Sequence, residues 1–145
     1  MHIRRMIEDD IPILAHIVAE NYSRALAESF TDEMLMTFAP YPYRPFFYAA
    51  IEDNEPIGCA GYVASWLAYG TFTLAWVNVA KRLHGRGIGR QLVNRCMSDL
   101  QAKGSFVILA TSVPDFYSKN WGFKKIADMT SENEHMGTII MSKNI

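Results

Sequence analysis

A glycine-rich turn lies between a predicted strand and an amphipathic helix, and it constrains this chain more than any other segment. The turn reads His84-Gly85-Arg86-Gly87-Ile88-Gly89-Arg90, and its glycines let the backbone turn tightly and approach a ligand closely. Apolar residues then recur at helical spacing as far as Leu100, and Gly104 is a candidate helix end. The start of such a helix presents unpaired N–H groups and about half a positive charge. The turn therefore predicts a diphosphate site, with Arg82, Arg86 and Arg90 adding positive charge.

Two nucleotide-binding motifs do not fit this turn. A Walker loop requires Gly-Lys followed by Ser or Thr, and neither tripeptide occurs in the sequence. A dinucleotide fingerprint requires G-x-G-x-x-G, but its last glycine would fall at Arg90 or at Leu92. The preceding strand is also predicted to be the third of a meander, whereas the fingerprint follows the first strand of a βαβ unit.

Composition narrows the classes of protein and partner. With 145 residues, half of them hydrophobic and a fifth charged, residues 1–145 are expected to form one globular domain. The net charge of −1 supplies no basic field, so we expect no nucleic-acid partner. Cys59 and Cys96 are isolated, which predicts free thiols in a cytoplasmic protein without a metal site.

One uncharged segment, Pro56–Ala80, is long enough to span a bilayer. Gly70-Thr71 interrupts it, and branched and aromatic residues flank this turn on both sides. The segment therefore predicts two buried strands, and we expect no membrane partner.

The rest of the chain predicts an α+β fold with a mixed, mostly antiparallel central sheet of about seven strands and helices on both faces. A first helix is expected to be capped by Asp9 or Asp10 and to bury Ala25, and a second to start at Thr31 and end before Pro40. A continuous apolar strand between two helices, at residues 106–110, predicts a parallel crossover. The expected strands are residues 2–7, 46–52, 57–67, 72–79, 106–110, 124–129 and 137–141, and the later helices are 87–103 and 114–121.

Two motifs in this order resemble the GNAT N-acetyltransferase superfamily. Val77-Asn78-Val79 followed by the turn is similar to the family's acyl-CoA motif, Arg/Gln-x-x-Gly-x-Gly/Ala after a strand. Phe116-Tyr117-Ser118-Lys119-Asn120-Trp121-Gly122-Phe123 is similar to its Phe/Leu-Tyr-x-x-x-Gly-Phe helix end. Two positions depart from the pattern. His84 replaces the leading Arg or Gln, and Ala110-Thr111-Ser112 stands where an Asn is often found.

The resemblance implies a GNAT-type sheet with a splayed cleft, acetyl-CoA as cosubstrate and no metal. In the family the turn binds the pyrophosphate, the splayed strand pairs with pantetheine, and a tyrosine lies near the thioester sulfur. That tyrosine is Tyr117, the expected catalytic residue. The expected cofactor-binding residues are Val77, Asn78, Val79, His84, Gly85, Arg86, Gly87, Ile88, Gly89, Arg90, Thr111, Ser112 and Phe116.

The acceptor implied by the resemblance is a primary amine, on a small molecule or a peptide, that attacks acetyl-CoA directly in a ternary complex. Many family members carry a glutamate on the fourth strand, but Phe72–Asn78 contains no acid, so no base is assigned. Candidates for the base elsewhere in the chain are five acids and one histidine: Glu28, Asp32, Glu33, Glu132, Glu134 and His135. The missing acid leaves a non-catalytic acyl-CoA-binding or sensor domain as the alternative.

Aromatic residues are dense in the first half of the chain and are expected around the substrate mouth, where they would suit an apolar or cationic amine. Those near Tyr41–Phe47 would also suit a homodimer. The set comprises Phe38, Tyr41, Tyr43, Phe47, Tyr62, Trp66, Tyr69 and Trp76.

Overall fold

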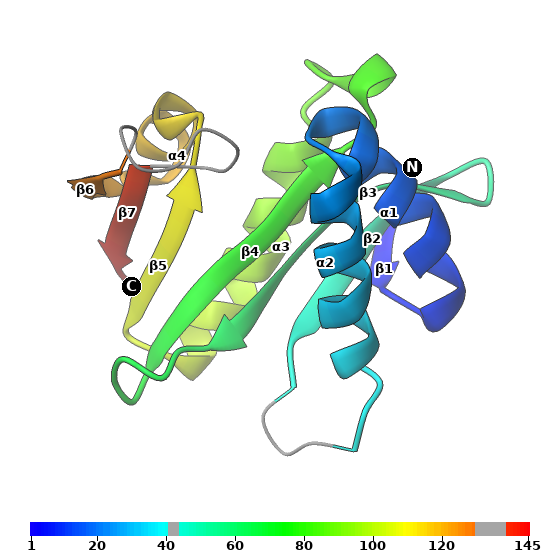
Figure 1. Ribbon diagram of the computed structural model, residues 1–145. Coiled ribbons are helices and arrows are strands. Elements are labelled where there is room, and N and C mark those ends of the chain that lie inside the picture. Colours follow the sequence, from blue (N-terminus) through cyan, green and yellow to red (C-terminus); the bar gives the residue numbers. More distant parts are fainter. Residues whose placement is uncertain (41–43, 130–138) are drawn as a thin grey trace.

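The computed structural model describes residues 1–40, 44–129 and 139–145, and these residues build one seven-stranded sheet in the order β1-β2-β3-β4-β5-β7-β6 (Figure 1). Its strands are β1 His2–Arg5, β2 Phe46–Glu52, β3 Glu55–Ala64, β4 Thr71–Val79, β5 Phe106–Thr111, β6 Lys124–Asp128 and β7 Ile139–Asn144. The α-helices are α1 Ile11–Asn21, α2 Arg24–Met36, α3 Ile88–Lys103 and α4 Pro114–Trp121, and two short 3-10 helices are η1 Glu8–Asp10 and η2 Lys81–Leu83.

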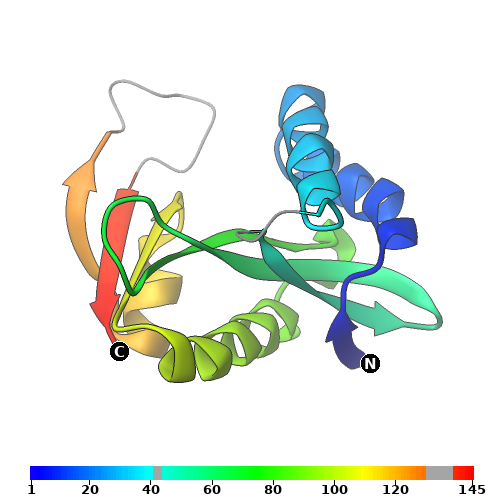
Figure 2. The ribbon, with the colours of Figure 1, turned by 90° about the horizontal axis from the view of Figure 1, so that it is seen from below.

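The sheet is mixed, as predicted. Neighbouring strands are antiparallel except β4 and β5, which run parallel and are joined through α3. Helices α1 and α2 cover one face, and α3 and α4 cover the other (Figure 2). The predicted α+β class with helices on both faces is confirmed.

The parallel pair is the feature that shapes the cleft. β4 pairs with β5 only where Thr71–Thr73 meets Phe106–Ile108. Beyond this point β4 continues to Val79 and β5 to Thr111 without pairing with each other, and the two strands separate as the arms of a V (Figure 1). The separation of these two strands that the family resemblance implies is therefore present.

The second helix begins earlier than predicted. The Ser23 side chain accepts a hydrogen bond from the Leu26 N–H at 3.2 Å, so Ser23 is the N-cap and α2 begins at Arg24. Thr31, the predicted start, lies inside α2, where its hydroxyl donates to the Ala27 carbonyl at 2.9 Å. This bond satisfies the hydroxyl within the helix, so a residue typical of caps does not interrupt it. Ala25 accordingly belongs to α2 and not to the first helix.

The predicted acidic cap is also wrong in detail. Asp10 occupies the N-cap position of α1, but its side chain makes no capping bond. Its buried carboxylate instead accepts two hydrogen bonds from the Arg4 guanidinium, at 2.7 and 2.9 Å, and one from the Ile7 N–H. Because charged groups are costly to bury unpaired, this bidentate pair fixes the chain between β1 and α1.

The uncharged segment forms β3 and β4, which confirms the prediction of two strands, although β3 ends at Ala64 and not at Leu67. No helix in the described part of the chain is long and apolar enough to cross a membrane. Cys59 and Cys96 are both buried and free.

Candidate functional site

The open edge of β4 presents backbone groups to the cleft. The Ala80 N–H donates to the Ile57 carbonyl at 2.8 Å, so the polar groups of Ala80 face β3. Because successive residues of a strand turn their N–H and C=O groups to opposite edges, those of Val77 and Val79 face the β5 side. Asn78, between them, is paired with Cys59 of β3. The structure thus places the two predicted pantetheine-pairing valines on the unpaired edge.

The carbonyl of Val79 is already held from two directions. Nδ2 of Asn21, at the end of α1, donates to it at 3.0 Å and also donates to Oδ1 of Asn78 at 3.1 Å. Nε2 of His84 lies 2.8 Å from the same carbonyl oxygen. Since a carbonyl only accepts, His84 donates from Nε2, and the histidine at the family's Arg/Gln position joins the turn to the end of β4.

The glycine turn is open toward solvent. Gly85 and Gly87 have φ of 85° and 79°, a left-handed conformation that favours glycine, and a Cβ added at either would meet nothing within 4 Å. The Gln91 N–H donates to the Gly87 carbonyl at 3.1 Å, which leaves the N–H groups of residues 88–90 without a helical partner. The turn therefore offers backbone donors and free space together, the arrangement that a pyrophosphate needs.

Gly89 brings the two sequence motifs together. A Cβ at this position would lie 3.6 Å from Cγ2 of Val79 and 3.8 Å from the Phe116 ring. Three predicted cofactor-binding residues, from β4, α3 and α4, therefore converge at the mouth of the cleft. Ile88 is buried beside them and anchors the first turn of α3 in the core.

One of the positive charges around the turn is already paired with a carboxylate. The Arg86 guanidinium donates to both carboxylate oxygens of Glu52, at 3.0 and 3.2 Å, and lowers the pKa of that carboxyl. The Arg86 side chain is exposed and that of Glu52 is partly exposed, so water screens the pair and a phosphate can compete for the arginine. Arg82 and Arg90 are exposed as well.

Tyr117 lies on the other arm of the cleft. Its side chain is buried on α4, with ring centroids of Phe116, Trp121 and Phe123 at 5.0, 5.8 and 6.0 Å. Burial raises the pKa of Tyr117, and the nearby Tyr22 phenol raises it further. Tyr22 follows the last residue of α1, and α1 and α4 lie on opposite faces of the sheet (Figure 2).

The connection from β5 to α4 uses one of the two predicted hydroxyls. Oγ1 of Thr111 accepts a hydrogen bond from the Val113 N–H at 2.9 Å and thereby shapes the turn. Ser112 is exposed. A hydroxyl is therefore available at Ser112, while the Thr111 hydroxyl keeps its O–H donor and one lone pair.

A bulge in β4 was not predicted from the sequence. The β3–β4 register shifts between Cys59 and Gly61, and Trp76 opposite this shift has φ of 52°. The Trp76 indole N–H donates to the Glu33 carboxylate, and its ring meets Phe30 edge-on at 5.4 Å. Both partners belong to α2, so the bulge draws an acidic side chain of α2 onto the open arm of the cleft.

The candidate acids differ in what they contact. Glu33 contacts β4, Glu28 pairs with Arg24 on α2 at 3.7 Å, and Asp32 is exposed. Glu132, Glu134 and His135 lie outside the described residues.

The aromatic residues predicted to surround the substrate mouth lie in different parts of the structure. Phe47 is buried in the core, Phe38 packs against the core, and Trp76 lies on the cleft. Tyr62, Trp66 and Tyr69 line a separate cavity near the start of β4, and Tyr41 and Tyr43 lie outside the described residues. These aromatics therefore do not form one mouth, and the burial of Phe47 removes it from the surface considered for a homodimer.

Comparisons with known proteins agree with this geometry. The profile of the Acetyltransferase (GNAT) family matches residues 13–123. No curated protein sequence matches. Among solved structures, a GNAT-family protein from Desulfovibrio desulfuricans has 24% identity and a TM-score of 0.80, with 99% of this chain and 98% of that chain covered.

Two further structures contain the cofactor. An aminoglycoside 6'-N-acetyltransferase complexed with coenzyme A has 17% identity, a TM-score of 0.75 and coverage of 99% and 97%. The PaiA N-acetyltransferase from Thermoplasma acidophilum, also with coenzyme A, has 20% identity, a TM-score of 0.72 and coverage of 99% and 98%. Since the family match covers most of the chain and the fold agrees along its length, the protein belongs to the GNAT family of acetyltransferases and takes acetyl-CoA as its cosubstrate.

Proposed function

We propose that this protein transfers an acetyl group to a primary amine by direct attack in a ternary complex, with residues 1–145 acting as one acyltransferase domain. Acetyl-CoA supplies the activated acetyl thioester. The observation that carries the proposal is the unpaired edge of β4 beyond Thr73, which ends at an open glycine turn and lies opposite the buried phenol of Tyr117.

The donor side is assigned from backbone groups. The N–H groups at residues 85–90 would hold the pyrophosphate, with Arg86 and Arg90 beside it. The Val79 carbonyl already accepts two hydrogen bonds, so pantetheine would pair with the Val79 N–H and with the backbone of Val77. Phe116 would pack beside the pantetheine arm, because it lies against the first turn of α3 near Gly89.

Tyr117 would stabilise the departing thiolate. Full proton transfer from a phenol with pKa near 10 to a thiolate near 8.5 is uphill by about 2 kcal/mol. Burial raises the phenol pKa and makes that transfer less favourable still. We therefore assign Tyr117 a hydrogen bond to the charge that develops on sulfur as the carbon–sulfur bond breaks.

On the acceptor side, Glu33 is the acid that the described structure favours. An alkyl amine is almost fully protonated at pH 7, and freeing its lone pair costs roughly 4–5 kcal/mol. The Glu33 carboxylate, held by the Trp76 indole on the open arm, would attract the ammonium and accept its proton directly or through water. The neutral nitrogen then attacks the acetyl carbon, and the carbon–sulfur bond breaks. The second proton that the nitrogen loses on becoming an amide passes through water to the departing thiolate, so coenzyme A is released as the thiol.

A covalent enzyme intermediate is not part of the proposal. Cys59 and Cys96 are both fully buried, and burial raises the pKa of Cys59 to about 12, so neither is a ready nucleophile. Two free thiols suit a reducing compartment, and the proposal places the protein in the cytoplasm.

The test is Tyr117→Phe, assayed by thiol release from acetyl-CoA with a panel of polyamine, aminoglycoside, amino-acid and peptide amines. The variant is expected to lower kcat about tenfold or more while coenzyme A binding changes little. Tyr48→Phe is the matched control, because it removes another phenol, on β2, that donates to Asp99 at 2.5 Å away from the cleft. It is expected to lose stability and keep kcat.

Two results would count against this proposal. An unchanged kcat in Tyr117→Phe removes the tyrosine from the mechanism. Tight binding of coenzyme A by the wild-type protein, with no turnover on any amine, favours the non-catalytic sensor.

A further inference from the structure

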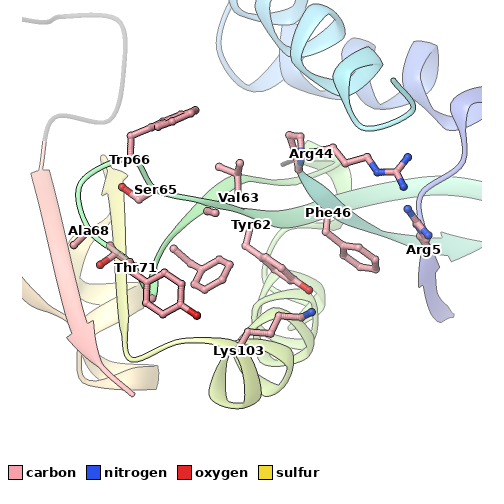
Figure 3. Close-up of a pocket in the computed structure, with 15 residues that line it drawn as sticks. Arg5, Arg44, Phe46, Tyr62, Val63, Ser65, Trp66, Ala68, Thr71 and Lys103 are labelled. Carbon is pink, nitrogen blue, oxygen red and sulfur yellow. The ribbon is translucent and has the colours of Figure 1, made fainter. Parts of the chain in front are cut away.

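A second cavity, of about 810 Å³, lies at the end of the sheet opposite the glycine turn (Figure 3). It is bounded by Phe46 at the start of β2, by the segment from Tyr62 to Phe72 that joins β3 to β4, and by Lys103 at the end of α3. The eight residue steps of β4 from Thr71 to Val79, at about 3.3 Å each, separate the cavity from the cofactor turn by roughly 25 Å. The acetyl-CoA cleft therefore leaves this cavity unexplained.

The inner wall of the cavity is aromatic. Phe46 and Tyr62 stack with ring centroids 5.5 Å apart at 18°, and Phe72 meets Tyr62 edge-on at 6.0 Å. Tyr69 stands at the rim and is fully exposed. A volume in this range and a wall of aromatic rings are typical of sites for small molecules that contain a planar ring.

The charged side chains around the cavity all carry the same sign. They are Arg5, Arg44 and Lys103, and the described lining contains no Asp or Glu. The Arg5 guanidinium lies over the Phe46 ring at 5.0 Å, and Arg44 donates to the Ala39 carbonyl at 3.4 Å. Within the described residues none of these cations has a carboxylate partner, although the chain as a whole carries a net charge of −1.

This combination selects a ligand chemistry. Three cations without a carboxylate partner among the described residues disfavour a cationic ligand and attract an anion, whereas the aromatic wall disfavours a small inorganic ion. Figure 3 shows Arg5 and Arg44 near Phe46, with Lys103 below Tyr62, so cations flank the aromatic wall on two sides. The acetyl acceptor is a cationic amine in the proposed function, so it does not match this site.

We propose that the cavity is a binding site for a small aromatic carboxylate. The ring lies against Phe46, Tyr62 and Phe72, and the carboxylate is bound by the arginines and Lys103 at the rim. This assignment does not depend on acetyl transfer, because none of these residues belongs to the proposed catalytic site.

Nuclear magnetic resonance titration with 2-naphthoate tests the proposal, with naphthalene-2-methanol as the neutral isostere and AMP as an aromatic phosphate. Naphthoate is expected to shift the amide signals of Phe46, Tyr62 and Phe72 and to leave those of the glycine turn unchanged. The affinity of the neutral isostere is expected to be lower than that of naphthoate by about tenfold or more, since the alcohol lacks the charge-assisted hydrogen bonds. Saturating coenzyme A should not displace naphthoate.

Exposed side chains allow the site to be altered without disturbing the core. Arg44→Ala and Lys103→Ala are each expected to weaken naphthoate binding about tenfold, whereas Arg24→Ala, an exposed arginine on α2, is expected to have no effect. Equal affinity for naphthoate and the alcohol, shifts confined to the glycine turn, or unchanged binding in both cavity variants overturns the proposal. Binding of AMP without binding of naphthoate overturns the carboxylate assignment.

Discussion

Nε2 of His84 donates to the carbonyl oxygen of Val79 across 2.8 Å, and so ties the glycine turn to the last residue of β4. Asn21 donates to the same oxygen at 3.0 Å from α1. The carbonyl is therefore fixed from both sides, and the strand edge beside it is oriented before any cofactor arrives. We propose that the histidine that departs from the family pattern positions this strand edge for the cofactor.

Replacing His84 tests this role. His84→Leu removes the donor and is expected to raise the KM for acetyl-CoA about three- to tenfold, the effect of one lost hydrogen bond. His84→Gln restores an N–H donor and is expected to stay close to the wild type. Steady-state kinetics at saturating amine give the KM values, and equal KM values for the leucine and glutamine variants would show that the bond does not position the turn.

The left-handed glycine of the turn supports a second prediction. Gly87→Ala places a Cβ at φ of 79° and is expected to cost about 1–2 kcal/mol of unfolding free energy and to weaken coenzyme A binding. Gly70→Ala is the matched control, because Gly70 has the same φ of 79° but lies in the turn between β3 and β4. Urea unfolding and calorimetric titration should show similar stability losses and a binding loss in Gly87→Ala alone. Equal losses of affinity would attribute the effect to general destabilisation.

The raised pKa of the buried Cys59 thiol predicts a loss of unfolding free energy at alkaline pH. Burial raises the pKa of Cys59 from about 9 to about 12, so the folded protein keeps a proton that the unfolded chain releases. The contribution of Cys59 to the free energy of unfolding is fully present below about pH 9. It falls as the pH rises toward 12, by up to about 1.4 kcal/mol per pH unit. Urea unfolding between pH 8 and 10.5 measures the slope, and Cys59→Ala is expected to make it shallower. An identical slope in the variant would assign the loss to other groups, such as Tyr117, whose pKa burial also raises.

The parts of the fold that the sequence predicts correctly lie in continuous segments of the chain. The glycine turn, the parallel crossover through α3 and the position of Tyr117 on α4 are each encoded in short segments whose local conformation determines their role. The limits of β2 and α4 agree with the prediction because apolar strand residues and Pro114 mark them clearly.

The remaining features depend on contacts between distant segments. Ser23 and Thr31 are both good helix caps, and only packing of Ala27 and its neighbours against the core selects the first. The positive φ of Trp76 falls on a residue that rarely adopts it, so no sequence signal marks the bulge. Asn21 lies 58 positions from its partner Val79, and Glu33 lies 43 from Trp76, which places both pairings beyond local pattern analysis.

The contact between Glu33 and Trp76 leads to the last prediction. Glu33→Gln keeps the size of the side chain and its ability to accept from the indole, but removes the negative charge that would attract an ammonium and take its proton. We expect kcat/KM for the best amine to fall about tenfold or more, while the KM for acetyl-CoA stays within about twofold. Asp32→Asn is the matched control, since it neutralises the adjacent exposed carboxylate of α2. A loss of the same size in both variants would indicate a general effect of negative charge on α2, and no loss in either would mean that the amine is deprotonated elsewhere.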